Sequence, residues 1–318
     1  MSQGNTRCSC RTTAVAILLL GAANILAQPA GGEAPPGEFR NPIILARTHL
    51  DEETGEPIRW GKIWIMEQDG SGLRQLTFGA VYDDQPALFS DGRHARYSEF
   101  RATSFSPEGG ARLIQINIYS GDRKVFAEEP GCALHHVNLA LPGDKLVYHH
   151  DCGDRKVQRV GSGPDSYEVN MWAANGVALG DGLIFMHEKN PFLPPREVAL
   201  VRLYGHGQGS KAVFLTDDSY LNRRPAISPD GQWLAWQTNA NGKDDEIFLA
   251  RIDGSGPRNL TNSPGLDGHP WFSRDGKWIV FESDRTGFQE IWEINLETLE
   301  QLQLTFGARN FSSRTPRW

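Results

Sequence analysis

The segment Pro225-Ala-Ile-Ser-Pro-Asp-Gly231, followed by Trp233-Leu-Ala-Trp236, decides the fold because its plan is repeated. The plan returns 45 residues later as Pro270-Trp-Phe-Ser-Arg-Asp-Gly276 and Trp278-Ile-Val-Phe281. In each copy a proline opens a short apolar run, and a tight turn separates it from a second run. A Leu-Thr pair keeps the same period, at intervals of 45 and 44 residues: Leu215-Thr216, Leu260-Thr261 and Leu304-Thr305.

A strand-and-turn repeat of this length predicts an all-β chain folded as a β-propeller. Each blade would hold four antiparallel strands, lettered A at the axis to D at the outside. Asp69-Gly-Ser-Gly72 and Asp253-Gly-Ser-Gly256 supply tight turns between strands C and D. Five A strands are expected to begin near residues 86, 134, 170, 225 and 270, and the fourth blade is expected to open with Val169–Ala174.

The two ends of the repeat array complement each other. The chain stops at Thr315-Pro316-Arg317-Trp318, which is the start of a repeat without its sequel. Pro42–Ala46 reads as a B strand without an A strand before it. Pairing of these strands would complete one blade and close the ring, which removes the open sheet edges. We therefore predict six blades over residues 41–318.

The first 40 residues are expected to lie outside this domain. Arg7 and Arg11 precede the apolar run Ala14–Ala23, which is short for a membrane span, and residues 1–27 therefore predict a cleaved signal peptide. Residues 28–40, rich in Pro, Gly and Ala, predict a disordered linker. We accordingly expect a periplasmic or secreted monomer without a membrane span after cleavage. An uncleaved anchor is the alternative.

Composition excludes some classes of function. The chain has 32 Lys and Arg against 39 Asp and Glu, a formal net charge of −7, and no basic stripe. Nucleic-acid backbones are bound by clustered cations, so nucleic acid is not an expected partner. The sequence has no Gly-x-Ser-x-Gly pentapeptide and no phosphate-binding glycine loop, which argues against serine-hydrolase and nucleotide chemistry.

Two cysteines remain after the expected cleavage, and they predict a disulfide. Leu141-Pro-Gly-Asp144 reads as a hairpin turn between Leu134–Ala140 and Lys145–Asp151. Antiparallel register around that turn sets Cys132 opposite Cys152 and His135 opposite His149. Disulfides persist in exported proteins, and one here would close a loop of roughly 20 residues, worth about 3 kcal/mol. Two reduced thiols are the alternative.

The repeat resembles the WD40-like repeat of TolB-type propellers. The resemblance rests on Pro225-x-x-Ser-Pro-Asp-Gly231, an apolar strand, an Ile-Phe or Ile-Trp strand, Asp-Gly-Ser-Gly and Leu-Thr, and it covers about residues 41–318. It implies the propeller fold and an exported binding scaffold. TolB carries a small α/β domain before its propeller, where this chain has the spacer.

Candidate binding residues gather at the predicted mouth of the channel. The residues just before the A strands should face it, and their mixed charges suit an acidic peptide end or a sugar acid. They are Asp84, Gln85, Arg224, His269 and Arg314. Polar groups bound to water are the alternative. The same rim should carry the long, irregular loops, which are His49–Gly61, Arg101–Ala111, Glu188–Arg196 and Gly307–Thr315.

Histidines on the third blade suggest a metal site. The expected register places His135 beside His149, with Asp151 close, and His269 begins an A strand near the axis. Three imidazoles and a carboxylate can hold one divalent transition metal. A cross-strand polar pair without metal is the simpler interpretation, and no cofactor is then expected.

We therefore expect a non-enzymatic, exported propeller that binds a protein or peptide partner at its loop-rich rim, as an envelope component of the TolB kind. One alternative is a metal-dependent lyase acting on polysaccharide uronides through the region of His135 and His149. Another is a carbohydrate-binding propeller that stacks sugars on Trp60, Trp172 or Phe192.

Overall fold

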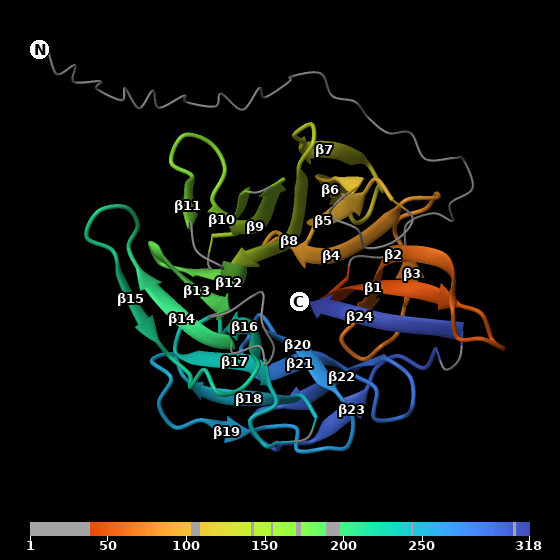
Figure 1. Cartoon of the computed structure of the whole chain (residues 1–318). Coiled ribbons are helices and arrows are strands. Elements are labelled where there is room, and N and C mark those ends of the chain that lie inside the picture. Colours follow the sequence, from red (N-terminus) through yellow and green to blue (C-terminus); the bar gives the residue numbers. More distant parts are fainter. Residues whose placement is uncertain are drawn as a thin grey trace, which may run out of the picture.

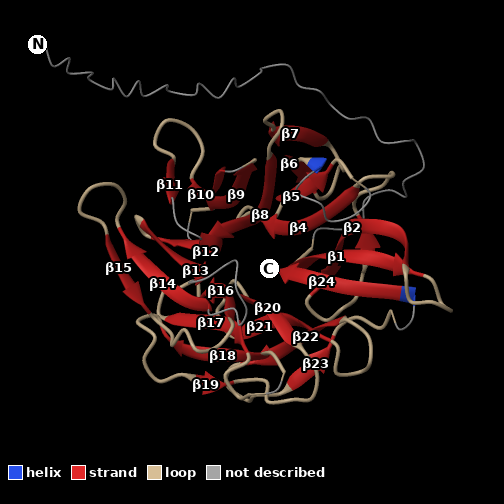
Figure 2. Cartoon of the chain, in the orientation of Figure 1, coloured by secondary structure: helices blue, strands red, loops and turns tan. Residues whose placement is uncertain are grey.

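The computed structural model describes residues 39–102, 109–140, 143–153, 155–169, 173–188, 198–242, 244–307 and 310–318. Strands, turns and loops make up nearly all of this part of the chain (Figure 2). The strands form four-stranded antiparallel sets that stand around a common centre, and the C-terminus lies near that centre (Figure 1). The predicted all-β class is confirmed. Among these residues no helix has the length and apolarity to cross a membrane. The signal peptide at 1–27 and nearly all of the linker at 28–40 lie outside the described residues.

The strands are given set by set, from the axis outward. The first set is β24 (Phe311–Arg317), β1 (Pro42–Leu50), β2 (Pro57–Glu67) and β3 (Arg74–Gln75). The second is β4 (Tyr82–Leu88), β5 (His94–Phe100), β6 (Ala111–Asn117) and β7 (Arg123–Ala127). The third is β8 (Ala133–Ala140), β9 (Lys145–Cys152), β10 (Arg155–Val160) and β11 (Tyr167–Val169). The fourth is β12 (Ala173–Leu179), β13 (Gly182–Glu188), β14 (Val198–Tyr204) and β15 (Lys211–Phe214). The fifth is β16 (Asn222–Ile227), β17 (Trp233–Thr238), β18 (Glu246–Arg251) and β19 (Arg258–Asn259), and the sixth is β20 (Asp267–Phe272), β21 (Trp278–Ser283), β22 (Glu290–Asn295) and β23 (Gln301–Gln303).

One predicted strand is corrected by the structure. Val169–Ala174 was expected to open the fourth blade, but Tyr167–Val169 is the outermost strand of the third set and Ala173–Leu179 is the inner strand of the fourth. The proline that marks the inner strand elsewhere is absent from this stretch, where Gly176 follows Asn175. The second and third sets also share one parallel pair, Ala111 with Ala133, and form an eight-stranded sheet.

The middle strands are buried on both faces because each sheet packs against a neighbour on either side. In β21 five of six residues are buried, and so are six of seven in β5, whereas β15 has no buried residue. Full burial of both faces explains why the inner repeats read as short continuous apolar runs and not as strict alternation. The outer strands are short and more polar, which protects the exposed sheet edges.

The last strand of the chain pairs with the first. β24 runs antiparallel to β1, with Arg317 opposite Ile44 and Ser313 opposite Arg47. Trp318 is 2% exposed and belongs to the largest apolar cluster of the core. The C-terminal residues are thus packed against the first strands, as the unfinished repeat predicts.

The threonine of the recurring Leu-Thr pair hydrogen-bonds to the start of the third strand of its set. The Oγ1 of Thr261 accepts the Ile247 N–H at 3.0 Å and donates to Glu246 Oε2 at 2.6 Å. Thr305 makes the same two bonds, to Ile291 and Glu290. Because these groups are buried, each hydroxyl satisfies a backbone donor and a carboxylate that water does not reach.

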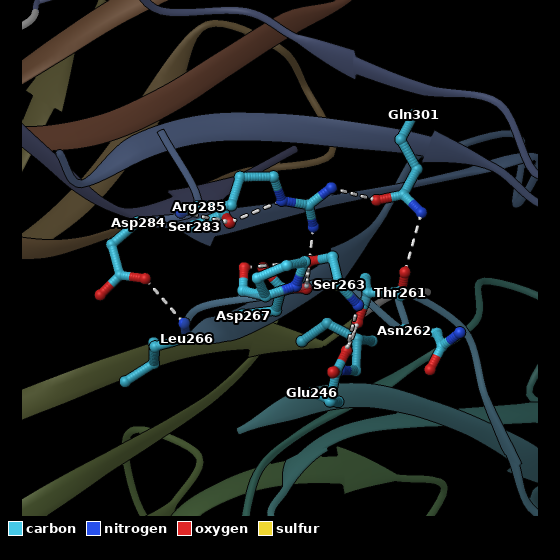
Figure 3. A network of polar contacts seen from close by, with 12 residues as sticks. Glu246, Thr261, Asn262, Ser263, Leu266, Asp267, Ser283, Asp284, Arg285 and Gln301 are labelled. Carbon is cyan, nitrogen blue, oxygen red and sulfur yellow. Dashed lines mark hydrogen bonds and ion pairs between the residues drawn. The ribbon is translucent and has the colours of Figure 1, made fainter. Parts of the chain in front are cut away.

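Figure 3 shows that the hydrogen bonds of Thr261 belong to a wider polar network between the fifth and sixth sets. Arg285 donates to Asp267 Oδ2 at 2.8 Å and to Gln301 Oε1 at 2.6 Å. Gln301 in turn donates to the Thr261 carbonyl at 3.1 Å. The network therefore connects the segment between β19 and β20 to the strands of the sixth set.

Cys132 and Cys152 form a disulfide. His135 is paired with His149 and Ala133 with Asp151, so the register predicted from the hairpin is the observed one. The bond ties the start of β8 to the end of β9 beside the histidines of the third set.

Candidate functional site

A ring of six side chains surrounds the centre of the molecule. Each inner strand has one non-glycine residue with a positive φ, between 48° and 55°. These residues are Gln85, His136, Asn175, Arg224, His269 and Thr315. The strand register shifts at these positions, which marks a β-bulge in each inner strand. All six line one narrow cavity, together with Val137, Asn138 and Arg317.

The repeated bulge is the reason the six side chains meet. A bulge adds one residue to a strand and re-aims its side chain. The left-handed backbone at a non-glycine residue is unfavourable by about 1–2 kcal/mol, so this conformation persists only where the surroundings enforce it. Its recurrence at one level around the axis makes the ring a built feature of the fold.

Hydrogen bonds link the ring from one set to the next. Gln85 Oε1 accepts the His136 N–H at 2.6 Å, and Asn175 Oδ1 accepts from Arg224 at 2.6 Å. Glu282 Oε2 accepts the Thr315 N–H at 2.9 Å.

Three more bonds fill the gaps between these. Thr315 Oγ1 donates to Asp84 Oδ1 at 3.0 Å, and the Asn175 N–H donates to His149 Nε2 at 2.9 Å. The His269 N–H donates to Gln237 Oε1 at 3.4 Å. The hydrogen bonds run around the whole axis, so the ring is held by neighbouring sets and not by its own strands alone.

Two guanidinium groups reach the cavity from different sets. Arg317 is 9% exposed, and its Nε has no hydrogen-bond partner. Burial lowers the pKa of Arg317 to about 9 and that of Arg224 to about 10. Both groups remain cationic at neutral pH. Within the described part of the chain neither has a carboxylate at ion-pair distance, and their charges are balanced only by more distant anions.

The two carboxylates behind the ring, Asp84 and Glu282, already have hydrogen-bond partners. Burial raises the pKa of Asp84, whose Oδ1 accepts the Gln85 N–H at 2.6 Å and whose Oδ2 accepts from the Tyr82 hydroxyl at 3.1 Å. Burial also disfavours ionisation of Glu282, but the adjacent His269 and the Thr315 N–H outweigh it and lower the pKa of Glu282 to about 2. Neither carboxylate lines the cavity, so the charge presented to the centre is positive.

A histidine cluster borders the ring on the third set. His135, His136 and His149 each place a ring nitrogen within 4.8 Å of the others. His135 Nδ1 lies 2.6 Å from His136 Nδ1, and His135 Nε2 lies 3.1 Å from Asp151 Oδ2. Burial and the neighbouring histidines lower the pKa of both His136 and His149 well below the ordinary value. His136 and His149 are therefore neutral imidazoles near pH 7.

The structure brings together some of the residues predicted from sequence and separates others. Gln85, Arg224 and His269 line the cavity, whereas Asp84 lies behind it and Arg314 is exposed. The bulge in β24 makes Thr315 the ring residue, one position after Arg314.

His135 and His149 lie together as expected, but His269 does not join them. Its Nδ1 lies 2.8 Å from Glu282 Oε1 on the next strand of its own set. The nearest third imidazole is that of His136, because the bulge turns it toward His135.

Sequence reasoning missed His136, Asn175 and Thr315 as ring residues. A signal existed for one of them, because Gln85, Arg224, His269 and Thr315 all stand directly before a proline. In the third and fourth sets valine and glycine replace that proline, at Val137 and Gly176, and the phase is lost. The side chain of Trp60 and the whole of Trp172 and Phe192 lie outside the described residues.

The sheets and their shared polar centre define a β-propeller with an axial cavity. The sequence profile of the TolB beta propeller domain matches residues 198–318, and the solved structures of TolB proteins share the propeller fold of the chain. TolB from Acinetobacter baumannii has a similar structure, with a TM-score of 0.70 at 18% identity over 89% of this chain and 68% of that one. A putative TolB from Agrobacterium tumefaciens gives a TM-score of 0.59 at 14% identity over 85% and 90%. An oligogalacturonate lyase in complex with manganese gives 0.50 at 15% identity over 76% and 70%. No curated protein sequence matches the chain.

Proposed function

We propose that the chain is an exported, non-enzymatic propeller of six blades that binds an anionic end of a protein or peptide partner in its axial cavity. The six-bladed closed ring is supported by the pairing of β24 with β1 and by the hydrogen bonds that run from set to set around the axis. Export is supported by the N-terminal apolar segment and by the disulfide, which persists in oxidising compartments. The likeness to TolB structures is the support for the proposed periplasmic location.

The observation that carries the proposal is the pair of guanidiniums at the cavity. A buried cation without a close counter-ion is costly, and an incoming carboxylate would offset that cost. Arginine suits this role because its planar donors match a carboxylate in a two-point contact. Arg224 and Arg317 line the same cavity, and burial and the nearby charge of Arg224 both lower the pKa of Arg317, so we infer that one carboxylate is received by both.

The size of the cavity indicates what enters it. Its volume is about 10 Å³, far below the 300–1,000 Å³ typical of pockets for whole small molecules and close to the room that one water molecule needs. We therefore infer that only the tip of a carboxylate would enter, with a shift of the lining side chains, whereas the body of the partner would lie on the rim. The exposed loop at residues 51–56, between β1 and β2, belongs to that rim. The other long loops predicted there lie wholly or partly outside the described residues.

A binding measurement on peptides tests the proposal. We would screen a peptide library with free C-terminal carboxylates and re-measure each binder with an amidated end. We expect amidation to weaken binding at least 10-fold, and Arg224→Gln and Arg317→Gln to weaken it by a similar factor. Arg155→Gln, an exposed arginine paired with Glu168, is the matched control. Equal affinity for both peptide forms, or for all variants, would reject an axial carboxylate site.

A uronide lyase is the second candidate function, and the histidine cluster beside the axial arginines favours it. The same guanidiniums would receive a uronate carboxylate, and the structurally similar oligogalacturonate lyase was obtained in complex with manganese. Release of unsaturated products from oligogalacturonate, measured by ultraviolet absorbance, would support this function. No product after prolonged incubation with added manganese would reject it for that substrate.

A further inference from the structure

The three histidines beside the axial ring have the arrangement of a metal site. His135 and His136 lie on β8 and His149 on β9, with ring nitrogens of all three within 4.8 Å of one another. We propose that His135, His136 and His149 together bind one divalent transition-metal ion, for which Zn²⁺ is the best-suited candidate. The proposal holds whether the cavity receives a peptide or a uronide.

The bulge explains how two consecutive residues serve one site. In a regular strand, adjacent side chains point to opposite faces of the sheet. His136 has a φ of 52°, and this turns its ring beside that of His135, with their Nδ1 atoms 2.6 Å apart. His149 is the direct cross-strand partner of His135, so its ring completes the cluster. Register and bulge therefore assemble the three donors without any loop.

The nature of the donors selects the ion. Three imidazoles suit Zn²⁺, Cu²⁺, Ni²⁺ or Fe²⁺, and they do not suit Ca²⁺ or Mg²⁺, which prefer oxygen. Three histidines with one open position are also a common zinc arrangement. The open position would face the axial cavity, because His136 lines that cavity with Arg224.

Asp151 supplies the outer contact that a metal-binding histidine usually has. Its Oδ2 lies 3.1 Å from His135 Nε2, so this ring donates from Nε2, and its Nδ1 accepts from His136 Nδ1 at 2.6 Å. The ion would replace the proton shared by these two Nδ1 atoms. A carboxylate in this position orients the ring and raises its basicity, and its loss typically weakens metal binding 10- to 100-fold. Asp151 is therefore a positioning residue.

Binding of the ion would require a hydrogen bond of His149 to break. Its Nε2 accepts the Asn175 N–H at 2.9 Å. The ion would take the place of this N–H at the nitrogen lone pair, and the Asn175 peptide would move. Because Asn175 is a ring residue and its side chain accepts a bond from Arg224, metal binding would reach the axial cavity through this one peptide.

Metal content and the Co²⁺ spectrum test the proposal. The full purified chain, free of any histidine tag, would be stripped with chelator, dialysed against Zn²⁺ or Co²⁺, and analysed for metal per chain. We expect close to one ion per chain and the intense visible absorption of four- or five-coordinate Co²⁺. His149→Gln and His136→Gln should weaken binding at least 100-fold, and Asp151→Asn about 10- to 100-fold.

His150→Gln is the matched control. His150 follows His149 on the same strand, but its Nε2 lies against Glu129 and Cys152 on another side of the sheet. We expect this variant to retain the ion. If His136→Gln fails to fold, His149→Gln and Asp151→Asn decide the outcome. Absence of bound ion in the wild-type chain, or loss in His150→Gln with retention in His149→Gln, would overturn the proposal.

Discussion

Replacement of Trp318 by alanine should destabilise the whole domain, although Trp318 is the last residue of the chain. Trp318 is 2% exposed and packs in the main core cluster with residues from several sets. Truncation of a buried tryptophan costs about 3–5 kcal/mol. For a domain of this size 1 kcal/mol lowers Tm by about 2–4 °C, so we expect a loss of roughly 6–20 °C.

The measurement is thermal unfolding followed by circular dichroism and by calorimetry. Phe306→Ala is the control, because Phe306 is 75% exposed and its loss should change stability by less than about 0.5 kcal/mol. The transition of Trp318→Ala should stay single, since β24 pairs with β1 and Trp318 packs in a core cluster shared by several sets. A melting temperature within 1–2 °C of wild type, or a separate early transition for the tail alone, would refute the reasoning.

Three further predictions concern single contacts. Thr261→Val should cost about 1–3 kcal/mol in urea unfolding, because it leaves the buried Ile247 N–H and the Glu246 carboxylate without their bond; Thr261→Ser should restore most of it. Replacement of both Cys132 and Cys152 by serine should cost about 2–5 kcal/mol, and a reducing agent should lower the Tm of the wild type alone. Burial raises the pKa of Glu293 from 4.5 to about 7, so the folded state keeps a proton that the unfolded state has lost between those values. Stability should therefore fall as pH rises from 4.5 to 7, by at most about 1.4 kcal/mol per pH unit, and Glu293→Gln should remove that slope; an unchanged slope would contradict the assigned pKa.

The periodic features of this protein could be predicted from the sequence because each four-stranded set packs against its neighbours in the same way. A strand buried on both faces needs a short apolar run, and a tight turn needs Asp and Gly, so both return at a regular interval. The hairpin between β8 and β9 could be placed in register because the turn residues fix it, and the disulfide followed from that register. The fourth set was misplaced where its inner strand lacks the proline marker.

The composition of the site could be anticipated only in part. Residues before the marker prolines were expected at the channel, and three of them line it, namely Gln85, Arg224 and His269. The left-handed backbone at these positions leaves no mark in the residue type, since Gln, His, Asn, Arg and Thr all adopt it here. For this reason Arg314 was expected at the cavity in place of Thr315, and His269 was expected in the histidine cluster in place of His136.

Local pattern alone was enough for the class of fold, the match between the two ends of the chain and the cysteine pair, since each of these depends on residues close together or repeated in phase. The partners of each charge depended on which sheets stand side by side. Glu282 contacts His269 and the Thr315 N–H, whereas Arg224 and Arg317 reach the centre without a close carboxylate. Contacts between sets can join residues far apart in the chain, such as Thr315 with Asp84 at a separation of 231 and Arg317 with Asn138 at 179. A linear sequence carries no record of which strands become neighbours around an axis.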